Sequence, residues 1–180
     1  MSATTTPTTP AEIDLVGAFV NTSDLQDGSD ELSTPVALGA WLVGAGLVEP
    51  GTPASGRDLR LALRLRDALR GELAGHHAGE TSPEATAAFE GVCCDLPLKA
   101  TCSGSGLTSA SSGVRGALGE LVAAATTARI KGSWRRLKIC PADDCGWAFY
   151  DPSRNRSKRW CSMEVCGNRS KVRAFRDRAR

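Results

Sequence analysis

The chain has 180 residues, of which 41% are hydrophobic and 23% charged, and its formal net charge at pH 7 is +2. This composition is typical of a soluble globular protein, and the length suits one medium domain with a small additional module. The longest uncharged apolar stretch, residues 36–48, is too short to span a bilayer, which excludes a membrane-spanning protein and predicts no membrane partner.

The small net charge conceals an asymmetry along the chain. Residues 131–180 contain 14 Lys and Arg against 5 Asp and Glu, a net charge of +9. Residues 1–130 contain 8 against 15, a net charge of −7. An acidic body followed by a basic tail predicts two functional units, the second of which meets a polyanion.

The first residues, MSATTTPTTPAE, are rich in Thr and Pro and contain no basic start followed by an apolar run. We therefore predict a disordered tail over residues 1–11 rather than a secretory signal. Without export, the expected compartment is the reducing cytoplasm, where the seven cysteines would not form a disulfide framework. A chain rich in Ala, Gly and Arg suggests a bacterium with a GC-rich genome.

The first apolar segment of the body, residues 15–20, is compatible with a strand or a short helix and ends in the turn sequence NTSD. A helix is expected to begin at Pro35, with Ser33 or Thr34 as its N-cap and Gly46 as its stop. The residues expected on its apolar face are Val36, Leu38, Trp41, Leu42 and Leu47.

The clearest helix covers residues 57–75, where leucines recur at helical spacing between arginines. Another helix is expected to begin near Ser82 and Pro83, and a third to cover residues 111–130. Between these two, residues 95–107 predict a short β-hairpin with a Gly/Ser turn. The residues of the third helix that are expected to face inward are Val114, Leu118, Leu121 and Val122.

Together these elements predict an α+β fold for residues 12–132, mainly helical and with one small β-hairpin. This body contains no phosphate-binding glycine loop and no Ser/His/Asp arrangement of recognisable spacing, so we expect a protein that is not an enzyme. A pocket between the helices stays open as an alternative, either for a small-molecule effector or for the substrate of an enzyme.

Three cysteines and both histidines lie within the body. Cys93, Cys94 and Cys102 could form a redox or metal site with His76 and His77, but adjacent cysteines bridge poorly and the histidines lie in a Gly-rich loop. We therefore expect ordinary buried thiols, and the sequence assigns no role to these five residues.

The cysteines of the tail follow the pattern C-x4-C-x15-C-x4-C. Four thiolates in two close pairs match the tetrahedral preference of Zn2+, and four protein ligands leave no open position for a substrate. The sequence therefore predicts a structural zinc site with the ligands Cys140, Cys145, Cys161 and Cys166. Reduced thiols without a metal, disulfides in an exported protein and an iron–sulfur cluster remain as alternatives.

The residues around these cysteines complete a small module over residues 133–180. WAFYD is expected to form a strand, PSRNRSKR a basic loop, and the segment from about Ser162 onward a helix. We expect Trp147 and Trp160 to fill the core of the module. Zinc binding, worth roughly 10–16 kcal/mol, would supply the folding free energy that so small a core lacks.

The terminal helix has a basic edge next to an apolar stripe. We expect the stripe, formed by Val165, Val172, Phe175 and Ala179, to pack on the zinc-binding turns and the aromatic residues, which leaves the basic edge free. Double-stranded DNA is the expected partner, and a solvated or self-docked basic face is the alternative. The residues predicted to contact nucleic acid are Arg154, Arg156, Lys158, Arg159, Arg169, Lys171, Arg173, Arg176 and Arg180.

The segment RWCSMEVCGNRSKVRAFR, together with CPADDCGWAFYD before it, resembles the CGNR zinc finger over residues 137–178. Upstream, FVNTSD, ELSTPVALGAWLVGAGL and RDLRLALRLRDALR are similar to the ABATE domain, which commonly precedes this finger. The resemblance implies a bacterial zinc-binding protein that binds DNA and regulates transcription, with the four tail cysteines as metal ligands. We expect Asn168 to brace the zinc loop, whereas Arg169 is equally compatible with bracing and with a base or phosphate contact.

The leading hypothesis is therefore a cytoplasmic bacterial regulator that binds DNA through the finger, while the body senses a ligand or mediates association. The first alternative is an RNA- or protein-binding adaptor with a purely structural finger. The second is an enzyme that uses a pocket of the body and carries the finger as an accessory. The sequence gives no indication of an oligomeric state.

Overall fold

A computed structural model provides the structure of the chain. The residues that it describes are 9–77, 79, 82–102 and 106–178. Most of the predicted tail, residues 1–8, lies outside the described residues, and so do the Gly/Ser turn at 103–105 and both Ala179 and Arg180. Helix begins at Ala11, within the range predicted to be disordered.

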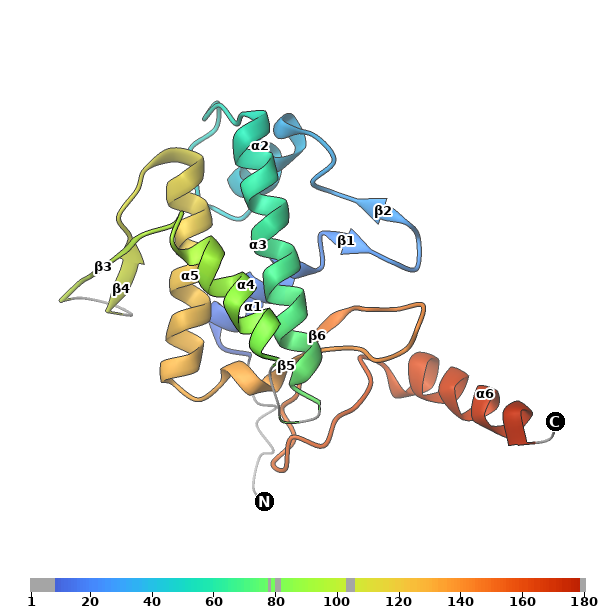
Figure 1. Ribbon diagram of the computed structural model, residues 1–180. Coiled ribbons are helices and arrows are strands. Elements are labelled where there is room, and N and C mark those ends of the chain that lie inside the picture. The colour runs from blue at the N-terminus through green and yellow to red at the C-terminus, as the bar shows by residue number, and fades with distance from the viewer. Residues whose placement is uncertain (1–8, 78, 80–81, 103–105, 179–180) are drawn as a thin grey trace, which may run out of the picture.

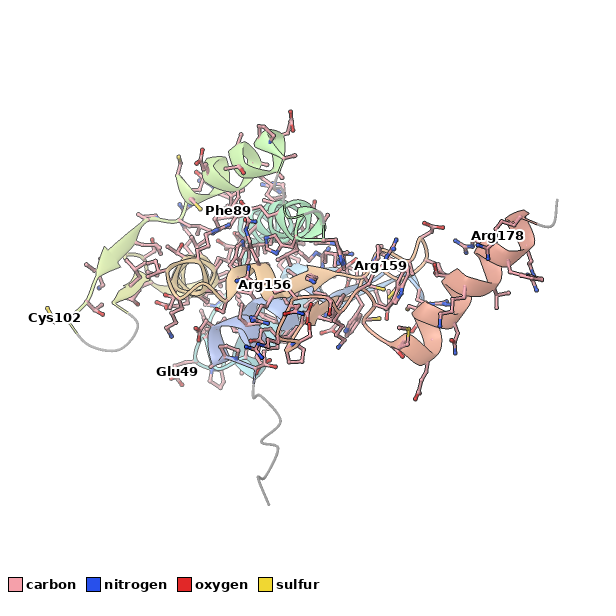
Figure 2. The ribbon with its side chains drawn as sticks, turned by 90° about the horizontal axis from the view of Figure 1, so that it is seen from below. Glu49, Phe89, Cys102, Arg156, Arg159 and Arg178 are labelled. Carbon is pink, nitrogen blue, oxygen red and sulfur yellow. The ribbon has the colours of Figure 1, made fainter. Side chains whose placement is uncertain are left out.

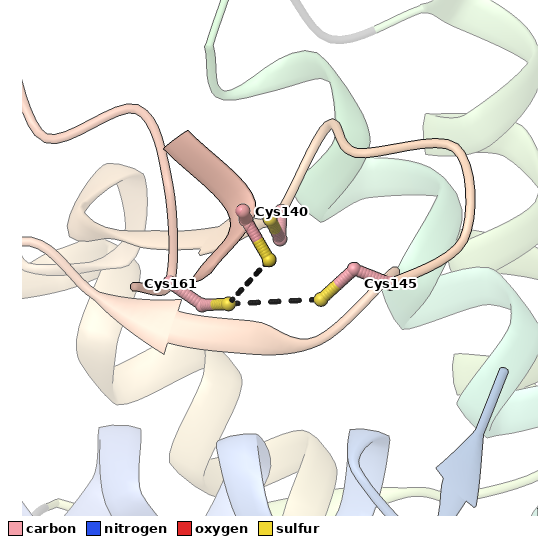
Figure 3. A group of neighbouring side chains, drawn as sticks. Cys140, Cys145 and Cys161 are labelled. Carbon is pink, nitrogen blue, oxygen red and sulfur yellow. Dashed lines mark hydrogen bonds between the residues drawn. The ribbon is translucent and has the colours of Figure 1, made fainter. Parts of the chain in front are cut away.

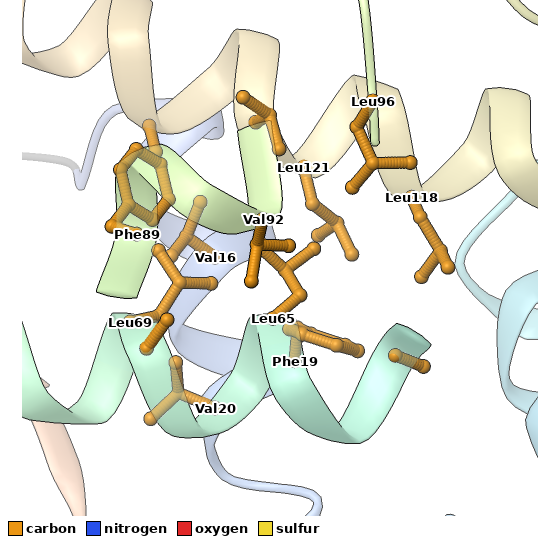
Figure 4. Packing of buried hydrophobic residues seen from close by; sticks show 14 of the residues in the cluster. Val16, Phe19, Val20, Leu65, Leu69, Phe89, Val92, Leu96, Leu118 and Leu121 are labelled. Carbon is orange, nitrogen blue, oxygen red and sulfur yellow. The ribbon is translucent and has the colours of Figure 1, made fainter. Parts of the chain in front are cut away.

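The body is a bundle of helices around one hydrophobic core (Figure 1). Its helices are α1 (Ala11–Val20), α2 (Pro35–Gly44), α3 (Gly56–Gly75), α4 (Pro83–Cys93) and α5 (Gly113–Ile130). α3 packs against α4, and α1 packs against α5. The side chains that meet between these helices in Figure 4 include Val16, Phe19, Leu65, Leu69, Phe89, Val92, Leu118 and Leu121. None of the described helices is long and apolar enough to cross a membrane.

Side-chain caps fix the first turns of three helices. Thr34 and Ser82 each accept a hydrogen bond, 3.1 Å long, from the backbone N–H three residues further along. Ser55 and Asp58 form a capping box at the start of α3. These caps satisfy backbone donors that a helix start leaves unpaired, and they confirm the helix starts expected near Pro35 and near Ser82.

Two expectations for the body change. Residues 15–20, which were compatible with a strand or a helix, belong to helix α1. Val36 is 82% exposed and lies outside the buried face of α2, which Leu38 and Leu42 form. The reason is geometrical, because two residues along a helix turn the side chain by about 200°.

Short β-hairpins lie beside the bundle. The pair β3 (Leu98–Ala100) and β4 (Leu107–Ser109) is antiparallel and confirms the predicted hairpin. The pair β1 (Ser23–Asp24) and β2 (Ser29–Asp30) was not expected, because its residues are polar and lack alternation. A buried arginine of α3 holds it: Nη1 and Nη2 of Arg66 donate to the two carboxylate oxygens of Asp30 at 2.7 and 2.6 Å.

The finger begins where α5 ends. Its elements are η1 (Trp134–Arg136), β5 (Leu137–Ile139), β6 (Ala148–Tyr150), η2 (Met163–Gly167) and α6 (Asn168–Arg178). β5 pairs antiparallel with β6, and η2 is a π-helical turn that leads into α6. Trp134, Leu137 and Ala148 belong to the same buried cluster as the helices of the body. The β5–β6 hairpin is therefore part of the core of the body.

Four side chains of the body hydrogen-bond to the backbone of the finger, and we call them the anchor residues. The pairs are Asn21 with Ala148, Arg70 with Gly146, His76 with Leu137 and His77 with Ile139. Asn21 makes two bonds, since its Nδ2 donates to the carbonyl at 2.9 Å and its Oδ1 accepts from the N–H at 2.7 Å. Each histidine donates a ring N–H to a carbonyl, at 2.6 and 2.7 Å, which gives both histidines a structural role.

Replacing Asn21 tests this anchoring. Asn21→Ala leaves the backbone N–H and C=O of Ala148, a buried residue, without their partners. We expect the free energy of unfolding, measured by urea denaturation, to fall by about 1–3 kcal/mol. Asn155→Ala is the matched control, because Asn155 is exposed, and it should change stability by less than about 0.5 kcal/mol. Equal losses in the two variants would contradict the anchoring role.

Candidate metal centre and basic surface

The four tail cysteines come from two turns that meet beside the β5–β6 hairpin. Cys140 follows β5 and Cys145 precedes β6, so the connection between the strands carries the first pair. The N–H of Cys140 donates to the carbonyl of Trp147 at 2.8 Å, which continues the strand pairing into this turn. Cys161 follows the basic loop, and Cys166 lies in the π-helical turn η2.

The four sulfur atoms lie within 4.8 Å of one another (Figure 3). The Sγ of Cys161 is 3.6 Å from the Sγ of Cys145 and 3.6 Å from that of Cys166. A tetrahedron with metal–sulfur bonds of about 2.3 Å has edges of about 3.8 Å, whereas a disulfide needs about 2.05 Å. The donor set therefore fits one metal ion held by four thiolates.

The site is closed to solvent on most sides. Three of its cysteines are buried and Cys161 is half-buried, with Phe149 and Trp160 packed against them. Burial raises the pKa of the Cys145 thiol to about 11, so a bound cation must displace protons. Trp147, expected in this small core, is instead 40% exposed, because side chains alternate along an extended segment and its neighbour Ala148 points inward. Four protein donors leave no position for a substrate, so the geometry suits a structural metal site.

The two residues that follow Cys166, Gly167 and Asn168, close the π-helical turn. A Cβ atom on Gly167 would clash with Sδ of Met163 and lie 3.2 Å from Cδ1 of Trp160, so a larger residue here requires the exposed Met163 side chain to move. Asn168 donates from Nδ2 to the backbone oxygen of Glu164 at 2.9 Å. This contact is the bracing contact expected for Asn168.

Two arginines expected on the free basic edge of α6 are paired with carboxylates. Nη1 of Arg169 donates to Oδ2 of Asp144 at 2.8 Å, and Nη2 donates to Sγ of Cys166 at 3.4 Å. Arg173 pairs with Asp143. Both aspartates lie between the first two cysteines, so these ion pairs join the start of α6 to the opposite metal-binding turn. The structure thus places Arg169 as a brace of the site.

Helix α6 projects away from the body (Figure 1). Val165 and Val172 are each 50% exposed and Phe175 is 68% exposed, so the expected packing of the apolar stripe on the finger is wrong. The ion pairs of Arg169 and Arg173 explain the difference, because they turn the basic edge toward the metal-binding turn and leave the stripe in solvent.

A buried ion pair that the sequence did not predict fixes the basic loop, residues 152–159. The side chain of Lys138 is 4% exposed and that of Asp151 is 0% exposed. Nζ of Lys138 donates to Oδ2 of Asp151 at 2.7 Å and to the backbone oxygens of Arg156 and Lys158 at 2.5 and 3.1 Å. The three ammonium hydrogens therefore have three acceptors, two of them in the loop.

Asp151 also holds the basic loop directly, through hydrogen bonds that its carboxylate accepts from residues of the loop. It accepts hydrogen bonds from the backbone N–H and the hydroxyl of Ser153 and from the N–H of Lys158. Burial acts to raise the pKa of Asp151, but the bonds from Lys138 and Ser153 outweigh burial and hold this pKa below its usual value. The available signal was positional: a lysine between two apolar strand residues, and an aspartate directly after the partner strand.

Most of the predicted nucleic-acid contacts are exposed cations that form no ion pair with the residues described. They are Arg154, Arg156, Lys158 and Arg159 in the basic loop and Lys171 and Arg176 in α6. Figure 2 shows Arg156, Arg159 and Arg178 in a row from the middle of the molecule toward the tip of α6. The remaining predicted contact, Arg180, lies outside the described residues.

A hollow of about 470 Å³ lies beside the basic loop. Its lining includes His77, Arg156, Ser157, Lys158 and Arg159. Burial lowers the pKa of His77, so the histidine is uncharged at neutral pH and the loop cations set the potential of the hollow. A hollow with this lining attracts anions.

The three other cysteines do not take part in this site. Cys93 is half-buried, and burial raises the pKa of its thiol to about 11. Cys94 and Cys102 are exposed, contrary to the expectation of buried thiols, because one follows the end of α4 and the other lies near the tip of the β3–β4 hairpin. Within the described parts of the chain, the tail cysteines are the one group of three or more His, Cys, Asp or Glu residues whose ligand atoms converge.

Replacing Lys138 should open the basic loop. Lys138→Met leaves Asp151 buried without its cation, and we expect the free energy of unfolding to fall by about 3–5 kcal/mol. Trypsin should also cut the loop faster, because two of its carbonyl groups lose their donor. Lys131→Met is the control. Lys131 pairs with Glu12 at 3.0 Å, and the lysine side chain is 56% exposed, so this ion pair contributes at most about 1 kcal/mol to stability. Similar losses in both variants, with no faster cleavage, would show that the buried pair does not hold the loop.

Removing one sulfur donor tests whether the β5–β6 hairpin stays folded without the metal site. Cys161→Ser should abolish the binding of one metal ion per chain, whereas Cys94→Ser should retain it, as measured by metal analysis of the purified proteins. In the first variant, hydrogen exchange should show loss of protection in residues 161–178. Residues 137–139 and 148–150 should stay protected, because the anchor residues hold them without the metal. Exchange of the whole hairpin at the rate of α6 would contradict this separation.

Comparisons with known proteins agree with this geometry. Residues 136–179 match the family model of the CGNR zinc finger, and the four cysteines lie within that match, so the site is of the zinc type. Residues 14–133, about two thirds of the chain, match the ABATE model, described as "Putative stress-induced transcription regulator". A search of curated proteins found no match. The chain therefore belongs to the ABATE family and carries a CGNR zinc finger after its ABATE region.

Proposed function

We propose that the chain is a zinc-binding transcription regulator that contacts double-stranded DNA through its finger. The observation that carries the proposal is the set of cations in the basic loop, which form no ion pair within the described residues and lie on a fixed backbone. A mobile basic tail loses conformational entropy when it meets phosphates. The buried pair of Lys138 and Asp151 reduces this cost, because the loop is ordered before it binds.

Zn2+ is the ion we propose for the metal site. Four thiolates whose sulfur atoms lie within 4.8 Å of one another favour zinc, and four protein ligands support a structural rather than a catalytic role for the ion. Thiolate ligands persist where disulfides do not form, so the proposal places the protein in the reducing cytoplasm of a bacterium.

The proposed contacts are to phosphate groups. Arg154, Arg156, Lys158 and Arg159 in the loop and Lys171 and Arg176 on α6 would neutralise phosphates and fix the register of the duplex. Arg169 and Arg173 contribute less to the free charge, because aspartates already neutralise them.

A second candidate function is protein binding, as in an adaptor with a structural finger. One observation favours it: Val165, Val172 and Phe175 form an exposed apolar stripe on a helix that projects from the body. A surface of this kind suits the groove of a protein partner better than a phosphate backbone.

The salt dependence of duplex binding tests the first proposal. Log affinity falls with log salt, and each lost phosphate contact makes this slope less steep by about 0.9. The triple variant of Arg154, Lys158 and Arg159 to Gln should therefore have a slope that is less steep by up to about 2.7. Fluorescence anisotropy of a labelled duplex measures the slope. Arg57→Gln is the control, because Arg57 is an exposed cation of α3 outside the finger, and it should leave the slope unchanged.

Two results would contradict duplex binding. One is an absence of binding by the unaltered, zinc-loaded chain at low salt. The other is a triple variant with the slope of the unaltered protein. Tighter binding of a single strand, or of no nucleic acid at all, would favour the adaptor.

A further inference from the structure

A cavity of about 420 Å³ lies where the body meets the finger, and we call it the junction cavity. Its walls come from α3, α4, the end of α5, η1 and the basic loop, so both parts of the chain form it. Its volume falls within the range of small-molecule sites, about 300–1,000 Å³. The lining residues that matter here are Glu72, His76, Arg129, Trp134, Arg135 and Arg156.

The inner wall is aromatic and electrically balanced. The guanidinium carbon of Arg129 lies 4.4 Å from the ring centroid of Phe89 and 4.6 Å from that of Trp134. Arg129 also pairs with Glu72, whose side chain is 6% exposed. Burial lowers the pKa of His76 to about 4, so His76 is uncharged at neutral pH. This wall suits the flat apolar part of a ligand.

The mouth of the cavity carries positive charge that no described carboxylate neutralises. Arg135 donates Nη1–H to the backbone oxygen of Gly79 at 2.7 Å and keeps further donors. Arg156 makes no side-chain hydrogen bond within the described chain, and its backbone is left-handed, with φ +53°. Such a backbone is unusual outside glycine, and here the bond from Lys138 to the Arg156 carbonyl helps to hold it. Strained residues of this kind cluster at binding sites.

We propose that the junction cavity binds a small organic anion, a carboxylate or a phosphate ester. Its charged group lies between Arg135 and Arg156, and its flat part lies against Trp134. Three guanidinium groups against the one carboxylate of Glu72 make the lining cationic, which disfavours a positively charged ligand.

Arg156 connects this cavity with the proposed DNA surface, because it also lines the hollow beside the basic loop. An anion in the cavity competes with a DNA phosphate for the same guanidinium group, so binding of the anion lowers the affinity for DNA. This consequence rests on the proposed function, whereas the occupation of the cavity does not.

Calorimetric titration of the full, zinc-loaded chain tests the site with benzoate, phenyl phosphate and benzamidine, flat probes that differ in their charged group. We expect at least one of the two anions to bind with a dissociation constant below about 10 mM. The benzamidine cation should bind at least about tenfold more weakly than that anion. The better anion shows whether the site prefers a carboxylate or a phosphate ester.

Variants of the loop localise the binding. Arg156→Asn should lower the affinity for the anion by about tenfold, which corresponds to the loss of one charge-assisted hydrogen bond. Asn is chosen because it tolerates the left-handed backbone. Arg154→Asn is the matched control in the same loop and should bind the anion as the unaltered chain does. Binding of neither anion, equal binding of benzamidine, or equal effects of the two variants would overturn the proposal.

A competition experiment tests the consequence for DNA. Duplex affinity is measured with the better anion near saturation and with chloride at the same ionic strength. We expect the anion to lower the affinity by about fivefold, at the low end of coupling between sites. An unchanged affinity would overturn the competition. A chain that binds no duplex at all would overturn the proposed function. The calorimetry would still show whether the junction cavity binds an anion.

Discussion

The hydrogen bonds from the body to the β5–β6 hairpin are the constraint on which the finger depends. Each strand of the hairpin has three residues, and an isolated two-stranded hairpin is marginally stable in water. Asn21 and Arg70 hold one side of it and the two histidines hold the other, while Leu137 and Ala148 join the core of the body. The metal therefore closes two turns onto a hairpin that the body already positions.

This arrangement divides the positive charge of the tail between two tasks. Lys138, Arg169 and Arg173 each pair with an aspartate and hold the loop or the helix in place. The exposed cations of the basic loop have no such partner within the described residues and remain for an external anion. The 14 Lys and Arg of the region thus overstate the cations available to a partner, because Lys138, Arg169 and Arg173 are already paired with aspartates inside the finger.

The sequence predicted what depends on local chemistry. The spacing of four cysteines predicted the metal site, and capping residues such as Thr34 and Ser82 predicted helix starts. It did not predict contacts between distant segments. The pair of Lys138 and Asp151 depends on strand register, and the pairs of α6 with the CPADDC turn depend on where the metal brings the helix. The exposure of Phe175 follows from those pairs and not from its place in the pattern.

The central claim is that the anchored, metal-closed finger presents the basic loop to duplex DNA. Hydrogen exchange of the zinc-loaded chain, with and without a duplex, tests it most directly. We expect residues 153–159 to gain protection when the duplex is added, while α2, on the far side of the body from α6 in Figure 1, exchanges as before. Unchanged exchange in the loop, or protection confined to the body, would contradict the claim.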